Sequence, residues 1–444
     1  MTTPPFPTDP TALEHMLDWA RTRITEGPDP RNGAQSFAAL DDRLGHSITS
    51  VGIGAAQAFA LFTDVIVPST RPFDHPTSLA FVAAAPSPAA LSVNAVLGAA
   101  EIFAGNWDGG SGAIHAENQA LGWLAGLAGW PHSAGGVFVS GGTLGNLSAL
   151  HAARIACTRF DRPATHILCS EEAHSSIAAV ASVMNVALIK VGADAQGRMQ
   201  ADAARAAVQD ATGIFAIVAN AGATNCGAVD DIAGLADLAQ ELDVWLHVDG
   251  AYGLAALADP EARPLFDGIE RADSFIVDPH KWLFAPYDSC ALVYREPLRG
   301  AQAHGQQGAY LETLDQEAWN PSDYALHLTR RARGLPLWYS LSTYGTDAYR
   351  QAIARTRQIA AEIAAGIEAT PGLELILGPQ LTVILFSPST LSDDALAEWA
   401  EAQRRSGALL CLPTTWRGEK VLRLCIVNPA TDPAHVLGVL GTLV

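Results

Sequence analysis

Short, continuous runs of apolar residues recur along the middle of the chain, and longer stretches rich in alanine and leucine separate them. Such runs are typical of strands that are buried on both faces of a sheet. The alternation predicts an α/β fold with a mostly parallel central sheet and helices on both faces. The predicted strands lie at 136–140, 165–169, 186–190, 214–219, 244–248, 274–277 and 289–295.

The pattern changes after about residue 336, where helical stretches flank shorter strands. We expect helices at 346–369 and 393–405, because their apolar positions repeat at helical spacing. Strands are predicted at 373–377, 382–386 and 421–426. This mixture predicts a small C-terminal α+β domain.

The N-terminal part has a weaker pattern. Residues 11–21 predict an amphipathic helix, whereas 68–88 is rich in proline and predicts irregular structure. A chain of 444 residues is too long for one ordinary core. We therefore expect an N-terminal segment over 1–85, a large domain over 86–335 and a small domain over 336–444.

Composition narrows the possible functions. The net charge of −19 argues against nucleic-acid binding, which requires clustered Lys and Arg. A hydrophobic content of 49% with only 16% charged residues suggests that a partner subunit covers part of the surface. We expect no transmembrane helix and no signal peptide. Six scattered cysteines without a Cys-x-x-Cys pair predict neither a disulfide scaffold nor a metal site, and they suit the cytoplasm.

Two apolar runs end abruptly in a charged residue. One is followed by Lys281, one of three lysines among 27 basic residues, and the other ends in Asp249. An amine between a buried strand and aromatic residues can be neutral and nucleophilic. A buried carboxylate is costly unless it faces a cation. A lysine to hold an aldehyde and an aspartate to hold a pyridinium nitrogen are the pair that a pyridoxal phosphate enzyme needs.

The segment Ser140-Gly-Gly-Thr143 follows a predicted strand and opens a long helix rich in alanine and leucine. Glycines let the backbone approach a ligand, and a helix N-terminus favours phosphate. The segment matches neither the dinucleotide-binding pattern nor the P-loop. Taken alone, these residues favour an ordinary glycine turn with Thr143 near a helix N-cap.

Five segments together resemble the group II pyridoxal-phosphate-dependent amino acid decarboxylases, the family of aromatic L-amino acid, histidine and glutamate decarboxylases. They occur in the family's order and span roughly residues 70–345. The resemblance implies a fold-type-I transferase-like structure, pyridoxal 5'-phosphate as cofactor, and a homodimer with shared active sites. The matching segments are Ser140–Leu150, Ala173–Ser176, His247–Tyr252, Asp278–Trp282 and Arg330–Arg333.

The resemblance also implies roles for single residues. Lys281 is expected to carry the cofactor, and Asp249 to hold its ring nitrogen. His174 is expected to stack on the ring, where it could touch the substrate carboxylate. Gly142 and Thr143 fall where the family binds the cofactor phosphate.

Further positions are implied around this group. Ala251 is expected to pack under the ring and Thr224 to lie near the cofactor, although Ala223 stands where the family often has a second threonine. His280 is expected to touch the phosphate or the substrate carboxylate, or only to flank the lysine. Because two anions repel each other, we expect no direct bond between Asp278 and the phosphate.

A proton donor and several arginines complete the expected site. Tyr310 lies in a polar, glycine-rich stretch, and its spacing from the lysine matches the family tyrosine that protonates the carbon left by CO₂. Tyr324 is the alternative donor. Arg331 and Arg333 are expected to form structural ion pairs, and Arg423 is a candidate partner for a substrate carboxylate.

The resemblance implies decarboxylation of an L-amino acid to an amine and CO₂. An aromatic substrate is favoured, while glutamate, aspartate and a diamino acid stay open. A decarboxylating aldehyde synthase, or another carbon–carbon lyase on the same scaffold, is the second hypothesis; a tyrosine rather than a phenylalanine at 310 speaks against the synthase. A non-catalytic dimeric binding protein is the third, and the Lys281–Asp249 pair argues against it.

Overall fold

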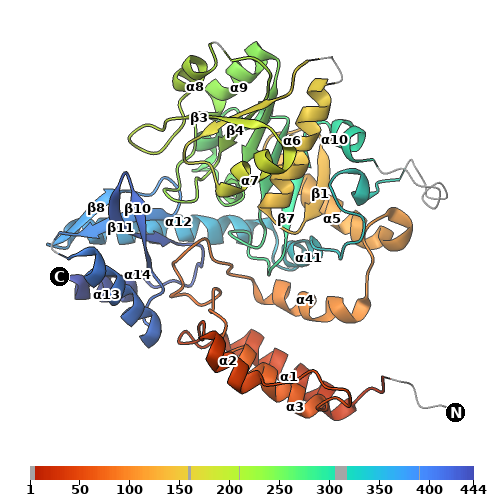
Figure 1. The fold of residues 1–444 in the computed structure, drawn as a ribbon, viewed down its shortest axis with the longest axis vertical. Coiled ribbons are helices and arrows are strands. Elements are labelled where there is room, and N and C mark those ends of the chain that lie inside the picture. Colours follow the sequence, from red (N-terminus) through yellow and green to blue (C-terminus); the bar gives the residue numbers. More distant parts are fainter. Residues whose placement is uncertain (1–5, 159–161, 210, 306–317, 390) are drawn as a thin grey trace.

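The computed structural model describes residues 6–158, 162–209, 211–305, 318–389 and 391–444. Its centre is a seven-stranded sheet in the order β1-β7-β6-β5-β4-β2-β3 (Figure 1). Every strand is parallel to the others except β7, which runs antiparallel to β1 and β6. The predicted strands are confirmed: β1 (Gly135–Val139), β2 (His166–Ser170), β3 (Ala187–Val191), β4 (Ile214–Asn220), β5 (Trp245–Asp249), β6 (Ser274–Val277) and β7 (Cys290–Tyr294).

Helices cover both faces of this sheet, as predicted. Because successive side chains of a strand point to opposite faces, Leu246 and Val248 of β5 join the core that includes α5 and α9, and Trp245 joins the core that includes α6 and α7. The polar end of β5 therefore faces α6. These helices are α5 (Trp107–Leu127), α6 (Gly142–Thr158), α7 (Ser175–Met184), α8 (Ala201–Ala207), α9 (Ile232–Leu242), α10 (Pro297–His304) and α11 (Leu335–Tyr344).

A second, four-stranded sheet follows in the order β10-β11-β9-β8, and its strand pairs are antiparallel. The predicted C-terminal helices and three of these strands are confirmed, but β10 was not predicted. Pro413 lacks a backbone donor and Thr414 and Thr415 are polar, which an edge strand tolerates. The elements are α12 (Thr346–Ala369), β8 (Leu373–Leu377), β9 (Val383–Pro388), α13 (Asp393–Ser406), β10 (Leu412–Trp416), β11 (Glu419–Cys425) and α14 (Pro433–Leu440).

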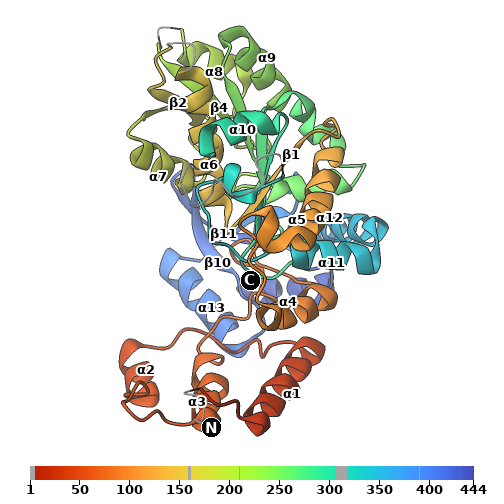
Figure 2. The same cartoon turned by 90° about the vertical axis from the view of Figure 1, so that its right-hand side faces the viewer.

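The N-terminal helices form a separate layer beyond α4, at the bottom of Figures 1 and 2. The predicted helix is confirmed as α1, which begins where Asp9 accepts a hydrogen bond from the N–H of Ala12. Arg23 of α1 pairs with Asp74 at 2.8 Å. The elements are α1 (Pro10–Glu26), α2 (Phe37–Leu44), α3 (Ala55–Leu61), a π-helical turn (Phe62–Ile66) and α4 (Pro88–Ala100).

Short 3₁₀ helices fill several connections, at Gly253–Ala258, Arg263–Phe266, Ile269–Arg271, Pro321–Asp323 and Gly441–Leu443. Among the helices of the described residues, none combines the length and apolarity needed to span a membrane.

Candidate active site

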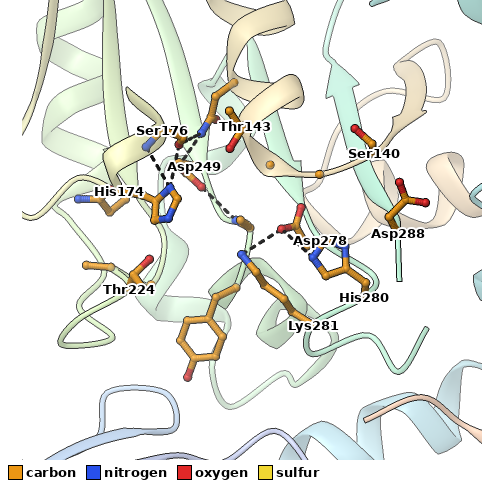
Figure 3. Close-up of a pocket in the computed structure, with 18 of the residues that line it drawn as sticks. Ser140, Thr143, His174, Ser176, Thr224, Asp249, Asp278, His280, Lys281 and Asp288 are labelled. Carbon is orange, nitrogen blue, oxygen red and sulfur yellow. Dashed lines mark hydrogen bonds and ion pairs between the residues drawn. The ribbon is translucent and has the colours of Figure 1, made fainter. Parts of the chain in front are cut away.

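The carboxyl ends of β4, β5 and β6 meet at one edge of the large sheet, which is where ligands bind in open α/β sheets. A cavity of about 340 Å³ lies there, between the start of α6 and the loops that follow β2 and β4 (Figure 3). Tyr310 lies outside the described residues. The residues expected to bind the cofactor all line the cavity: Gly142, Thr143, His174, Thr224, Asp249, Ala251, His280 and Lys281.

Lys281 lies one turn beyond the end of β6, and its Nζ is 2.9 Å from Oδ2 of Asp278. Burial lowers the pKa of Lys281, but the charges of Asp278 and then of Asp249 outweigh burial and raise the pKa above its usual value. The expectation of a neutral amine is therefore wrong for this arrangement. The lysine is an ammonium ion that its neighbouring carboxylate holds in the cavity.

Asp249 ends β5 and is only 8% exposed. Its Oδ2 accepts a hydrogen bond of 2.9 Å from Nδ2 of Asn146, and its Oδ1 accepts one of 3.2 Å from the N–H of Ala251. Both donors are neutral, and within the described part of the chain no basic side chain lies within 4.0 Å of this carboxylate. Its negative charge is thus left available to a cation in the cavity.

His174 lies at the N-cap of α7, after β2. Its Nδ1 accepts a hydrogen bond of 3.2 Å from the N–H of Ser176 and lies 2.9 Å from Oγ of the same serine. That hydroxyl also accepts a hydrogen bond of 3.0 Å from Asn146. Figure 3 shows His174 and Thr224 on one side of the cavity, with Asp278, His280 and Lys281 on the other.

The N-terminus of α6 forms another wall. A Cβ added at Gly142 would lie 3.2 Å from Cδ1 of Ile276, which is a tight contact, and in ordinary contact at 3.4 Å with Ala251 and Asp278. Thr143 follows it on the same helix turn. A helix N-terminus presents backbone N–H groups and the positive end of the helix dipole, which suits a phosphate.

Two other expectations concern His280 and Arg423. Nδ1 of His280 donates to the carbonyl of Ser289 at 2.6 Å, and burial lowers the pKa of this imidazole. Arg423 donates to the carbonyls of Asn225, Phe81 and Thr224 at 3.1, 2.6 and 2.6 Å. Three of its five N–H groups are therefore bonded to the backbone, and its contact with a substrate carboxylate stays a prediction.

The ion pairs predicted for Arg331 and Arg333 are confirmed, because both contact Asp288, at 2.7 and 3.3 Å. Tyr324 stacks on Trp319 at a centroid distance of 4.3 Å and does not line the cavity.

Sequence reasoning gave no role to several residues that line the cavity, among them Asn146, Ser176, Tyr287 and Asp288. Asn146 follows Thr143 at a spacing of three residues, so both lie on one face of α6. That spacing was the available signal for Asn146. Tyr287 and Asp288 lie in the loop between β6 and β7, where no periodic pattern points to them.

An amine, a carboxylate without a cationic partner and a helix N-terminus thus share one cavity. These groups fit pyridoxal phosphate, which carries an aldehyde, a protonated ring nitrogen and a phosphate. The comparison with known proteins decides between this cofactor and an unrelated ligand. Residues 56–388 match the family described as the pyridoxal-dependent decarboxylase conserved domain.

The chain belongs to this decarboxylase family. It is 32% identical over 420 residues to an aromatic-L-amino-acid decarboxylase of Bacillus atrophaeus, covering 90% of this chain and 87% of the relative. It is 30% identical over 424 residues to an L-2,4-diaminobutyrate decarboxylase of Rhizobium meliloti (strain 1021), covering 92% and 85%. The protein is therefore a pyridoxal-phosphate-dependent amino acid decarboxylase.

Solved structures agree with the fold of this decarboxylase. The structure of Oryza sativa TDC with PLP and tryptamine superposes with a TM-score of 0.88 at 23% identity, covering 100% of this chain and 98% of the other. The mouse CSAD structure superposes with a TM-score of 0.86 at 23% identity, covering 98% of each chain. The expected fold-type-I architecture, with a mostly parallel sheet, is confirmed.

Proposed function

We propose that this decarboxylase acts on aromatic L-amino acids and releases the corresponding amine and CO₂. The observation that carries the proposal is the joint presence of Lys281 and Asp249 in one cavity, on opposite sides of the space that α6 closes. The similarity to the Bacillus atrophaeus enzyme supports the aromatic substrate.

Pyridoxal phosphate supplies an aldehyde that condenses with amines and a ring that accepts an electron pair. Lys281 would hold the aldehyde, and Asp249 would keep the ring nitrogen protonated. At about 4 Å and an effective dielectric constant of about 20, such a charge pair has a raw attraction of about 4 kcal/mol. His174 would stack on the ring, with Ala251 beneath it.

The remaining residues of the cavity hold the phosphate and position the substrate. Gly142 and Thr143 at the start of α6 would bind the phosphate, and Thr224 and His280 would flank the cofactor. Asp278 takes no part in binding the phosphate, because its carboxylate pairs with Lys281. Asp278 would hold the free amine of Lys281 in place as an ammonium ion.

A proton must return to the α-carbon after CO₂ leaves. We assign this step to Tyr310 on its position in the sequence alone. Tyr324 is the weaker candidate, because it packs on Trp319 outside the cavity and burial raises its pKa to about 12. General acids of this kind typically contribute about 10²–10⁴-fold to the rate.

We also infer that two copies of the chain pair through residues 1–85, so that the active sites are shared. Apolar side chains of this segment lie in water in the single chain: Phe37, Ile48 and Val51 are 83%, 98% and 93% exposed. Such exposure is typical of a surface that a partner covers. Sedimentation of the wild-type protein as a monomer at micromolar concentration would exclude this pairing.

A diamino acid is the second candidate substrate. The Rhizobium meliloti relative is named as an L-2,4-diaminobutyrate decarboxylase. A second cavity, of about 360 Å³, adjoins the first through His174 and Thr224, and Glu172 lines it. Burial raises the pKa of Glu172, yet its carboxylate remains the natural partner for a cationic side chain there.

The substrate is tested by incubating the purified protein, loaded with pyridoxal phosphate, with pooled L-amino acids. We expect an arylalkylamine as the main product and CO₂ in equal amount. A diamine would move the assignment to the second candidate, and an aldehyde with little amine would favour the aldehyde synthase. The Lys281→Ala variant is the control for any amine that forms without catalysis at this site.

A further inference from the structure

The face of β5 that meets α6 carries three polar or amphipathic side chains in strict alternation. Trp245, His247 and Asp249 point to this face because strand side chains alternate every second residue. His247 is fully buried, and its register partner on β6 is Ser274, which is also fully buried. A buried line of polar groups thus runs beneath the cavity and ends at the Asp249 carboxylate.

Hydrogen bonds connect this line without a break. Nε1 of Trp245 donates to Oγ of Ser274 at 2.8 Å, and that hydroxyl lies 2.8 Å from Nδ1 of His247. Nε2 of His247 lies 2.8 Å from Oδ1 of Asn146. Asn146 is 1% exposed, and its Nδ2 reaches Asp249 at 2.9 Å.

Only one assignment of donors and acceptors gives every residue of this hydrogen-bond network a partner. The ionised Asp249 accepts only, so Asn146 must present its NH₂ group to it and its oxygen to His247. Nε2 of His247 must then carry the proton, and Nδ1 must accept from Ser274. Burial lowers the pKa of His247 to about 4, so the ring is neutral and can adopt this tautomer.

The side-chain amide of Asn146 is also linked, through Ser176, to His174 on the opposite wall of the cavity. The second N–H of Asn146 donates to Oγ of Ser176 at 3.0 Å, which leaves the serine hydroxyl to donate to Nδ1 of His174 at 2.9 Å. Nδ1 of His174 is thereby held as an acceptor, which leaves Nε2 as the ring atom that carries a proton. One amide therefore links the group proposed to face the ring nitrogen with the group proposed to stack on the ring.

We propose that Asn146 and His247 are positioning residues that hold the Asp249 carboxylate and the His174 ring in the orientation needed to bind pyridoxal phosphate. The inference rests on the proposed roles of Asp249 and His174. Without an N–H at position 247, Oδ1 of Asn146 is buried without a donor. The amide that donates to Asp249 and Ser176 is then held less firmly.

The test compares two substitutions of His247 in the apo-protein. His247→Gln keeps an N–H that can reach Asn146, whereas His247→Leu has a similar size and no donor. Equilibrium dialysis gives the Kd for pyridoxal phosphate, and thermal melting of the apo-proteins reports on packing. We expect the Leu variant to bind at least ten-fold more weakly than wild type, and the Gln variant to stay within about three-fold.

A milder pair of variants covers the case in which His247→Leu does not fold. Ser274→Ala removes the donor to Nδ1 of His247 and should weaken binding about three- to five-fold. Ser340→Ala is the matched control, because Ser340 is equally buried and its hydroxyl interacts with Ser87 and Tyr349, neither of which lines the cavity. The control should lower the melting temperature without changing the Kd.

The possible results distinguish a failure of the proposed function from a failure of the positioning role alone. Wild-type protein that does not bind pyridoxal phosphate would overturn the proposed function and this inference with it. Normal binding by wild type and equally tight binding by His247→Leu, or by Ser274→Ala where the former does not fold, would overturn only the positioning role. Equal losses in the Gln and Leu variants, with equal drops in melting temperature, would assign His247 to packing alone.

Discussion

Neighbouring strands β5 and β6 both lead into an aspartate at the cavity, yet the two carboxylates are held in opposite ways. Asp249, at the end of β5, is bonded to the amide of Asn146 and to a backbone N–H, both of which are neutral. Asp278, just after β6, is paired with the ammonium group of Lys281 at 2.9 Å. One charge is left for a ligand, and the other is already neutralised by the chain.

This difference explains how two similar residues serve different tasks. A carboxylate held by neutral donors keeps its orientation and still attracts a cation, which a protonated ring nitrogen would supply. A carboxylate beside a lysine instead raises the pKa of that lysine. Under the proposed function, the end of β5 would stabilise the cofactor ring, and the end of β6 would hold the lysine as an ammonium ion.

The largest effect is expected at the end of β5. Asp249→Asn should leave a folded protein that decarboxylates at least several hundred-fold more slowly, on the order of 4 kcal/mol of transition-state stabilisation, because a neutral amide cannot keep the ring nitrogen protonated. Steady-state kinetics measure the loss, and circular dichroism checks the fold. Near-normal turnover would show that Asp249 is structural and that the contrast with Asp278 has no catalytic meaning.

The next largest effect is expected at Tyr310, which lies at neither strand end and is proposed to return the proton to the α-carbon. Tyr310→Phe should reduce amine formation by about 100-fold while CO₂ release falls less, because the α-carbon lacks its proton donor and dissolved oxygen diverts the product to an aldehyde, ammonia and peroxide. The ratio of CO₂ to amine measures this separation, and Tyr324→Phe is the matched control. Equal CO₂ and amine in the first variant, with an imbalance in the second, would transfer the role to Tyr324.

Acid should destabilise the protein through its buried histidines, one of which lies in the β5 network. Burial lowers the pKa of both His247 and His304 to about 4, from about 6.5 in the unfolded chain. The unfolded state then binds more protons, so stability is full above pH 6.5 and is lost as the pH falls toward 4. Each histidine should account for about 2 kcal/mol at pH 5.

The check is urea unfolding of wild type, His247→Gln and His304→Gln at pH 7 and pH 5. Each variant should lose less stability between the two pH values than wild type does. His304 contacts the Ser148 carbonyl and has no place in the β5 network, so His304→Gln should leave cofactor affinity unchanged, and His247→Gln should stay within about three-fold of wild type. Identical pH dependence in all three proteins would contradict the assignment of neutral, buried rings.

The smallest effect concerns the lysine. Asp278→Asn removes the charge that opposes burial, so the pKa of Lys281 should fall and more of the amine should be neutral at pH 8. Each pKa unit makes the capture of pyridoxal phosphate by the apo-protein up to ten-fold faster. Stopped-flow absorbance from pH 6 to pH 10 gives the midpoint, and an unshifted midpoint would show that Asp278 does not control this lysine.

Much of the large sheet could be predicted from the sequence, because its strands are buried on both faces and appear as unbroken apolar runs. The same logic missed β10, where Pro413 and two threonines are allowed only because the strand lies at a sheet edge. The charged ends of the runs marked Lys281 and Asp249. The protonation of Lys281 could not be predicted, because it depends on how close Asp278 comes to the lysine in space.

The residues behind the cavity were harder to find. Asn146 looks like an ordinary polar position on a helix, and His247 like a residue inside a strand. Their function depends on contacts between α6, β5 and β6 that no local pattern encodes. Two spacings carried partial information: three residues between Thr143 and Asn146, and two between His247 and Asp249.

The central claim is that Lys281 carries the cofactor. The chain offers only two other lysines, Lys190 and Lys420, so the measurement is decisive. The protein is loaded with pyridoxal phosphate, reduced with borohydride, digested and mapped by mass spectrometry. The account predicts a single pyridoxyl label on Lys281, and a label on Lys190 or Lys420, or on no lysine, would contradict it.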